Sequence, residues 1–94
     1  MRVKWLRNAL LNIEDEAAYL EKENAVAASQ FVARIFGAAQ QLSKFPAMGR
    51  PGRVAGTREL IVPGTKYIIP YRVRNDAVEI LRVFHTSRKW PYRF

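Results

Sequence analysis

The hydrophobic residues of this chain recur at helical spacing in its first half and at strand spacing in its second half. In the first half, two apolar stripes at intervals of three and four residues predict amphipathic helices over about residues 7–23 and 25–44. The stripes consist of Leu10, Ile13, Ala17 and Leu20, and of Ala28, Phe31, Val32, Ile35, Ala39 and Leu42. The chain can turn at Glu23-Asn24-Ala25, and so short a connection predicts an antiparallel hairpin with Asn24 as a capping residue.

Turn-forming residues divide the second half into strands. Three strands are predicted from alternating apolar residues, over residues 58–62, 66–74 and 77–85. Pro63-Gly64 and Asn75-Asp76 mark tight turns between them, and such short connections predict an antiparallel meander. Pro70 cannot donate a ladder hydrogen bond, so we expect it where its nitrogen needs no partner or at a bulge. A short strand over residues 1–6 and a loop over residues 48–56 complete the chain.

The predicted order is therefore β-α-α-β-β-β, an α/β fold of the α+β type. In such a fold the helical hairpin packs on one face of a small, mainly antiparallel sheet. The opposite face stays partly open, and the arginines of the strands can point toward it. At 94 residues the chain is expected to form one domain, residues 1–94, with a core of modest size.

Three absences in the sequence exclude classes of function. There is no cysteine, which removes disulfides and thiolate chemistry and agrees with a reducing, cytoplasmic location. Because His85 is the single histidine, we expect neither a metal site nor another cofactor. No apolar run approaches the ~18 residues that a membrane-spanning helix needs, and Met1–Trp5 does not have the pattern of a signal peptide.

The positive charge is concentrated in the second half of the chain. Residues 1–43 contain five basic and five acidic residues, whereas residues 44–94 contain eleven basic and three acidic ones. The second half therefore carries the whole net charge of +8. Solubility alone does not require such segregation, so the pattern predicts one face that binds a polyanion or an acidic protein.

Two arginine-bearing segments of this half are candidates for binding an anionic target. Arg50 and Arg53 lie in a glycine-rich loop that lacks the spacing of a nucleotide-binding loop, and an ordinary basic turn is the alternative. Arg58 shares strand parity with Leu60 and could clamp an anion through two hydrogen bonds. An ion pair on the sheet is the alternative for Arg58.

A third segment joins Arg82 and His85 to a basic, aromatic tail that contains Arg88, Lys89 and Trp90. Cationic and aromatic side chains together suit phosphate contacts and base stacking. Histidine can act as a general acid or base near neutral pH, although a strand-end histidine is more often structural. Arg82 and His85 have opposite strand parity, so they share a site only if the strand ends or bulges between them. For Trp90, packing over the end of the sheet is the alternative to a binding role.

Other catalytic chemistries lack the necessary residues. No serine lies in a nucleophile elbow, which argues against a Ser-His-Asp triad. Outside the first helix the only carboxylates are Glu59, Asp76 and Glu79. The acidic cluster on the first helix is expected to be a solvated face and consists of Glu14, Asp15 and Glu16.

Five short motifs in order resemble the RelE/ParE superfamily of bacterial toxins, and the ParE branch in particular. They are Pro46-Ala47-Met48-Gly49-Arg50, Thr57–Leu60, Tyr67–Val73, Ile80–His85 and Arg88–Pro91. The resemblance covers nearly the whole chain. It implies a toxin of a type II toxin–antitoxin system, with the β-α-α-β-β-β fold and a cognate ParD-like antitoxin.

By this resemblance, we expect an inhibitor of DNA gyrase rather than an enzyme. The target-binding residues would be Arg50, Arg53, Arg58, Arg82, Arg88, Lys89 and Trp90. The alternative is a RelE-like endoribonuclease that cuts messenger RNA on the ribosome. In that case Arg58, Arg82 and His85 would be the catalytic residues.

Overall fold

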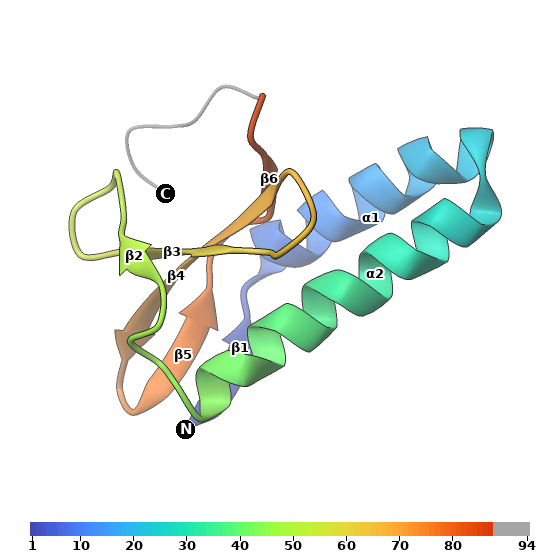
Figure 1. The fold of residues 1–94 in the computed structure, drawn as a ribbon. Coiled ribbons are helices and arrows are strands. Elements are labelled where there is room, and N and C mark those ends of the chain that lie inside the picture. The colour runs from blue at the N-terminus through green and yellow to red at the C-terminus, as the bar shows by residue number, and fades with distance from the viewer. Residues whose placement is uncertain (88–94) are drawn as a thin grey trace.

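A helical hairpin packs on one face of a six-stranded sheet in the computed structural model, which describes residues 1–87 (Figure 1). The helices are α1 (Arg7–Glu23) and α2 (Ala25–Gln40), and a 3₁₀ helix, η1 (Gln41–Ser43), follows α2. The strands are β1 (Arg2–Trp5), β2 (Arg50–Pro51), β3 (Arg58–Ile61), β4 (Tyr67–Arg74), β5 (Ala77–Ile80) and β6 (Phe84–His85). This arrangement confirms the α+β fold class predicted from the sequence.

Asn24 separates the two helices and caps the second. Its side-chain Oδ1 accepts hydrogen bonds from the backbone N–H groups of Val26 and Ala27, at 2.9 and 3.2 Å. A cap of this kind stabilises a helix by about 1 kcal/mol. The first helix has the predicted bounds. The second ends at Gln40 rather than near residue 44, because its last turn tightens into η1 ahead of Phe45-Pro46.

The strands lie side by side in the order β1-β5-β4-β3-β2, with β6 also paired to β4. The predicted meander is confirmed, since β3, β4 and β5 pair antiparallel in succession. Asn75 and Asp76 join β4 to β5 with φ angles of 52° and 57°. Positive φ at both positions is the geometry of a tight hairpin turn that Asn and Asp tolerate. At the other edge of the sheet, β1 pairs in parallel with β5.

The third predicted strand, residues 77–85, is interrupted opposite Pro70. Tyr71 pairs with Ile80 and Ile68 pairs with Phe84, so Leu81, Arg82 and Val83 face only Ile69 and Pro70. Three residues of one strand therefore lie opposite two of its partner, and this extra residue makes a β-bulge. Pro70 has no N–H to offer, and its carbonyl accepts from the N–H of Leu81 at 2.9 Å. The prediction of one continuous strand was therefore wrong, and Pro70 lies at a bulge, which is one of the two settings expected for it.

Smaller differences from the sequence prediction concern strand ends. The loop over residues 48–56 contains the short strand β2, which the sequence did not indicate. The outer bounds of β1, β3 and β4 are each one residue or so shorter than predicted. Such shifts are usual because strand ends fray and depend on partner strands.

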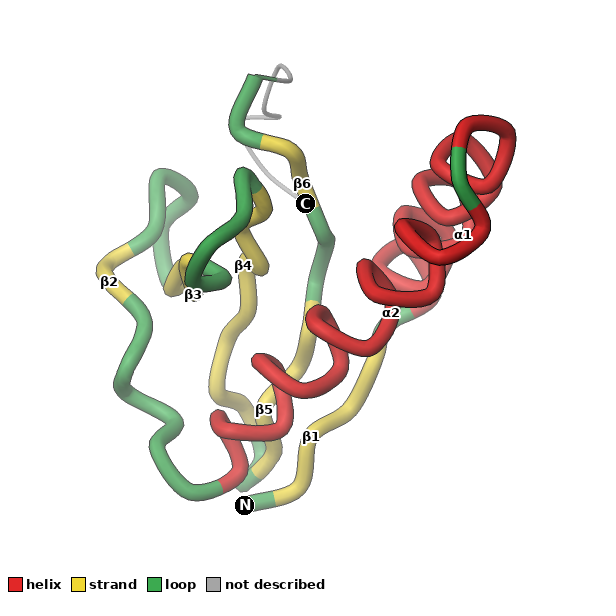
Figure 2. Tube along the Cα trace, turned by 45° about the vertical axis from the view of Figure 1, so that its right-hand side comes forward, coloured by secondary structure: helices red, strands yellow, loops and turns green. Residues whose placement is uncertain are grey.

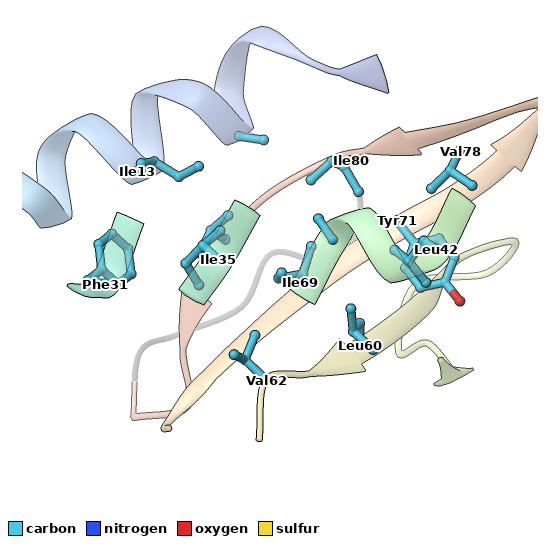
Figure 3. Packing of buried hydrophobic residues seen from close by; sticks show 13 residues of the cluster. Ile13, Phe31, Ile35, Leu42, Leu60, Val62, Ile69, Tyr71, Val78 and Ile80 are labelled. Carbon is cyan, nitrogen blue, oxygen red and sulfur yellow. The ribbon is translucent and has the colours of Figure 1, made fainter. Parts of the chain in front are cut away.

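The core lies between the helical hairpin and one face of the sheet (Figures 2 and 3). Its largest fully buried side chains include Tyr71, Ile35, Leu42, Ile69 and Ile80. The apolar stripe of α2 is buried as predicted, but Leu10 of the α1 stripe is 44% exposed and Ala9 is buried instead. Within residues 1–87, neither helix is both long and apolar enough to cross a membrane.

Candidate functional site

A buried carboxylate organises the loop that carries Arg50 and Arg53. Glu59 on β3 is 2% exposed, because β2 pairs Arg50 directly opposite it. Arg50 donates to Glu59 Oε1 from Nε at 3.2 Å and from Nη2 at 3.1 Å. The backbone N–H of Arg53 donates to Glu59 Oε2 at 2.8 Å, and the side-chain Nε of Arg53 lies 3.7 Å from the same oxygen. The two arginine side chains stay about half-exposed, so Glu59 presents them together at the surface.

A second anchor of this loop is the phenol of Tyr71. Its oxygen accepts from the N–H of Gly49 at 2.9 Å and donates to the carbonyl of Pro46 at 2.7 Å. Burial raises the pKa of Tyr71 above its ordinary value, against smaller lowering effects of the Gly49 hydrogen bond and the Arg58 charge. The phenol therefore keeps its proton and can hold both sides of the loop.

Arg58 lies on the sheet face that the helices cover, not on the opposite face where strand arginines were expected. It pairs with Tyr71 and shares a face with the buried Leu60. Its Nη1 donates to the carbonyls of Gly49 at 2.8 Å and Ala47 at 3.3 Å. These contacts correspond to neither of the two expected roles, an anion clamp or an ion pair on the sheet. In this structure Arg58 supports the loop that presents Arg50.

His85 lines a small hollow of about 160 Å³ together with acidic side chains of α1. The hollow is lined by Asn12, Asp15, Glu16, Tyr67, Val83, Phe84 and His85. The phenol of Tyr67 donates to the carboxylate of Glu16, and the rings of Tyr67 and His85 meet edge-on at 5.3 Å between centroids. The N–H of Ser87 donates to His85 Nδ1 at 3.2 Å, which places the proton of a neutral ring on Nε2.

Two residues of this hollow differ from the sequence-based expectation. Glu16 was expected on a solvated face, but it is 6% exposed because Tyr67 covers it and bonds to it. Asn12 was not singled out, and its Oδ1 accepts from the N–H of Val83 in the bulge at 3.0 Å. Neither role has a sequence signal, because each depends on how α1 packs against distant segments, β4 for Glu16 and the bulge for Asn12.

Arg82 lines a different hollow, of about 280 Å³, at the point where β1 leads into α1. Its lining consists of Leu6, Arg7, Asn8, Arg72, Leu81 and Arg82. The strand is interrupted between Arg82 and His85, which was the condition for a shared site. The two residues nevertheless line different hollows. The three residues of the alternative catalytic set, Arg58, Arg82 and His85, are therefore at three separate places. Arg88, Lys89 and Trp90 lie outside the described residues.

Arg72 is bound to Glu79 on the sheet face away from the helices, with Arg72 Nε 2.6 Å from Glu79 Oε1. This hydrogen bond is the main cause of a lowered pKa for Glu79, and the charges of Arg72, Arg74 and Lys4 add to it. A carboxyl with a lowered folded-state pKa stabilises the fold above its unfolded pKa, and that stabilisation is lost as the pH falls through the folded pKa.

Replacement of Arg72 with Gln is expected to raise the pKa of Glu79 back toward its ordinary value of 4.5. The Arg74→Gln variant should produce a smaller rise, because Arg74 acts on Glu79 through its charge alone. An NMR titration of the Glu79 carboxyl in the two variants measures both shifts. Equal shifts in the two variants would contradict the assignment of the hydrogen bond as the main cause.

An apolar groove of about 490 Å³ lies between the helical hairpin and the turn from β3 to β4. Its lining consists of Leu20, Ala27, Gln30, Phe31, Ala33, Arg34, Ile35, Thr65 and Tyr67. Phe31 and Tyr67 pack with their ring centroids 4.7 Å apart. Arg34 reaches toward the turn, where its Nη1 is 3.5 Å from the carbonyl of Pro63 and 3.4 Å from that of Gly64.

Metal-binding residues do not gather anywhere in the described part of the chain. Within residues 1–87, no group of three or more His, Cys, Asp or Glu side chains could hold a metal ion.

This chain is similar in sequence to proteins that are named toxins and in structure to a toxin–antitoxin system. Residues 3–90 match the family described as ParE toxin of type II toxin-antitoxin system, parDE. The chain is 47% identical over 90 residues to "Putative toxin Y4kP" of Sinorhizobium fredii, covering 96% of this chain and 93% of that protein. It is 32% identical over 87 residues to Toxin RelE2 of Caulobacter vibrioides, covering 93% of this chain and 97% of that protein. A solved structure of the chromosomal ParDE TA system from P. aeruginosa matches with a TM-score of 0.82 and 26% identity, covering 93% of this chain and 97% of that one.

Proposed function

The chain belongs to the ParE toxin family of type II toxin–antitoxin systems, and from this membership we propose that it inhibits DNA gyrase in the cytoplasm and is neutralised by a cognate ParD-like antitoxin. The observation that carries the proposal is the match of residues 3–90, nearly the whole chain, to that family. The surface features described above support separate places for the antitoxin and the target.

The apolar groove supports the antitoxin part of the proposal. An amphipathic helix can lay its apolar side against a groove of this kind, with anchors at helical spacing. Ala27, Ala33 and Phe31 supply apolar lining, and Arg34 supplies a cation beside it. We propose that an acidic, amphipathic segment of the antitoxin occupies the groove and pairs a carboxylate with Arg34.

The arginine loop supports a place for the target. Arg50 and Arg53 are held by Glu59 yet keep half of their side-chain surface exposed. Arginines that are fixed in position lose less conformational freedom on binding, which favours their use as interface anchors. We propose that Arg50 and Arg53 contact the target together with Arg82, Arg88, Lys89 and Trp90. For Arg58 we propose a positioning role, through the loop carbonyls that it binds.

Ribosome-dependent mRNA cleavage is the second candidate function, and the likeness to Toxin RelE2 favours it. The hollow around His85 argues against it. Cleavage of a phosphodiester needs cations close to the reacting phosphate. That hollow instead contains the carboxyls of Asp15 and Glu16, while Arg58 and Arg82 lie elsewhere. An acidic lining would repel the phosphate that a catalytic histidine has to reach.

A test on translating ribosomes separates the two functions. The wild-type protein and the His85→Gln variant are both expected to leave mRNA intact, and both are expected to inhibit supercoiling by purified gyrase. The reason is that His85 lies in an acidic hollow and bonds to Ser87, away from the exposed arginines. Cleavage of mRNA by the wild-type protein that is lost in His85→Gln would establish the RelE-like activity instead.

A further inference from the structure

The sheet face away from the helices presents cations in two rows. Strand pairing aligns Lys4, Glu79 and Arg72 across β1, β5 and β4. The next row along the same strands consists of Arg2, Ala77 and Arg74. Adjacent strands lie about 4.8 Å apart, so four cations occupy a patch about 10 Å wide. Both helices lie on the other side of these strands (Figure 2).

The arginine-lined hollow adjoins this patch. The N–H of Leu6 donates to the carbonyl of Ile80 at 3.0 Å, which ties the start of α1 to the start of the bulge. This contact brings Arg7 from α1 beside Arg82 from the bulge, and Arg72 from β4 lines the same hollow. None of the described residues that line it is acidic. Three arginines from three segments therefore line one space of about 280 Å³.

The carboxylates on this side of the described sheet are few, and two of them are paired with arginines. Glu79 is held by Arg72, and Glu59 is held by Arg50. Asp76 lies in the turn between β4 and β5. Most other acidic residues lie on α1, in the helical layer. Among the described residues, this face therefore carries more cations than carboxylates.

The chemistry of this face fits a phosphate backbone better than a protein partner. Protein interfaces concentrate their binding energy in arginines and in aromatic or apolar side chains that become buried around them. The six positions of the two rows are charged except for the small Ala77, so they offer arginines but no aromatic or large apolar side chain to bury with them. Binding to nucleic acid needs only cations that replace the counterions of the phosphates.

We propose that this face of the sheet binds the phosphate backbone of duplex DNA, with Arg7, Arg72 and Arg82 as its central contact. The toxin would then hold the DNA on which gyrase acts, as well as contacting the enzyme. The choice of DNA rests on the proposed function, but binding to bare DNA is measured without gyrase. Failure of DNA binding would thus leave gyrase inhibition to be judged by its own assay.

The test is fluorescence anisotropy of a labelled 20-base-pair DNA duplex between 50 and 200 mM NaCl. Each phosphate that is neutralised contributes about −0.9 to the slope of log K against log salt concentration. The Arg7→Gln/Arg82→Gln variant is therefore expected to lose about two units of slope. The Lys22→Gln/Lys44→Gln variant has the same net charge, but Lys22 lies on α1 and Lys44 directly follows η1, outside the two rows and the hollow, so its slope should equal that of the wild type.

One further variant and two further ligands, single-stranded RNA and the antitoxin, make the outcome decisive. The Arg7→Lys/Arg82→Lys variant keeps both charges and should keep the slope, which separates loss of charge from loss of fold. Absence of duplex binding at 50 mM NaCl, or an equal loss of slope in the Lys22/Lys44 control, would overturn the proposal. Equal affinity for single-stranded RNA would overturn the choice of DNA. If Arg7→Gln/Arg82→Gln weakened antitoxin binding and not DNA binding, the face would belong to the antitoxin.

Discussion

The Ala33→Glu variant is expected to bind the antitoxin about 100-fold more weakly than the wild type, or worse, which corresponds to about 2.7 kcal/mol. Ala33 is an exposed position of α2 that lines the apolar groove. A carboxylate there would have to lose its hydration when an apolar helix face covers it, and burial of an unpaired charge is strongly unfavourable. It would also repel an acidic partner. Isothermal titration calorimetry with the purified antitoxin measures the loss.

The matched control for this prediction is Ala18→Glu. Ala18 is an exposed alanine of α1 that does not line the groove, so the same change in charge should leave antitoxin affinity within about threefold. Both variants should unfold at nearly the wild-type urea concentration, because neither alters the core. An Ala33→Glu protein that binds the antitoxin as tightly as Ala18→Glu does would place the antitoxin elsewhere on the surface.

The Gly49→Ala variant is expected to lose about 2–3 kcal/mol of unfolding free energy and to melt about 10–20 °C lower. A methyl group at Gly49 would lie 2.6 Å from Tyr71 Cε1, 2.7 Å from the Tyr71 hydroxyl and 3.0 Å from the carbonyl oxygen of Glu59. Tyr71 is fully buried and cannot move aside cheaply. A shift of the loop would also weaken the hydrogen bond from Gly49 to Tyr71.

The same substitution at Gly37 is the control, and it should have the opposite sign. Gly37 lies within α2, and a methyl group there would meet no other atom within 4 Å. Alanine is favoured over glycine in a helix interior by about 1 kcal/mol, so Gly37→Ala should stabilise the protein by about that amount. Urea unfolding of the two variants measures both effects. Equal stability of Gly49→Ala and the wild type would contradict the described packing of the arginine loop.

The parts of the fold that local chemistry determines could be predicted from the sequence. Asn24 caps α2 because its side-chain oxygen can accept from the backbone N–H groups at the start of the helix. Asn75-Asp76 can adopt the positive φ angles of a two-residue turn. Pro70 required a gap in the hydrogen-bond ladder, and the bulge supplies it. In each case the residue type limits its own backbone or that of its immediate neighbours.

The parts of the site that depend on distant contacts could not be predicted in this way. The guanidinium of Arg58 binds the loop carbonyls of Ala47 and Gly49, which lie 11 and 9 residues earlier in the sequence. Glu16 is buried because Tyr67 reaches it from the sheet, 51 residues away in the sequence. The hollow around Arg82 requires the bulge to lie beside the start of α1, which no local pattern indicates.

The proposed activity is tested most directly by supercoiling of relaxed plasmid by purified gyrase, with the toxin added alone and with its antitoxin. We expect the toxin to inhibit supercoiling in proportion to its concentration, and one equivalent of antitoxin to restore it. Full supercoiling in the presence of a large excess of folded toxin would contradict gyrase as the target.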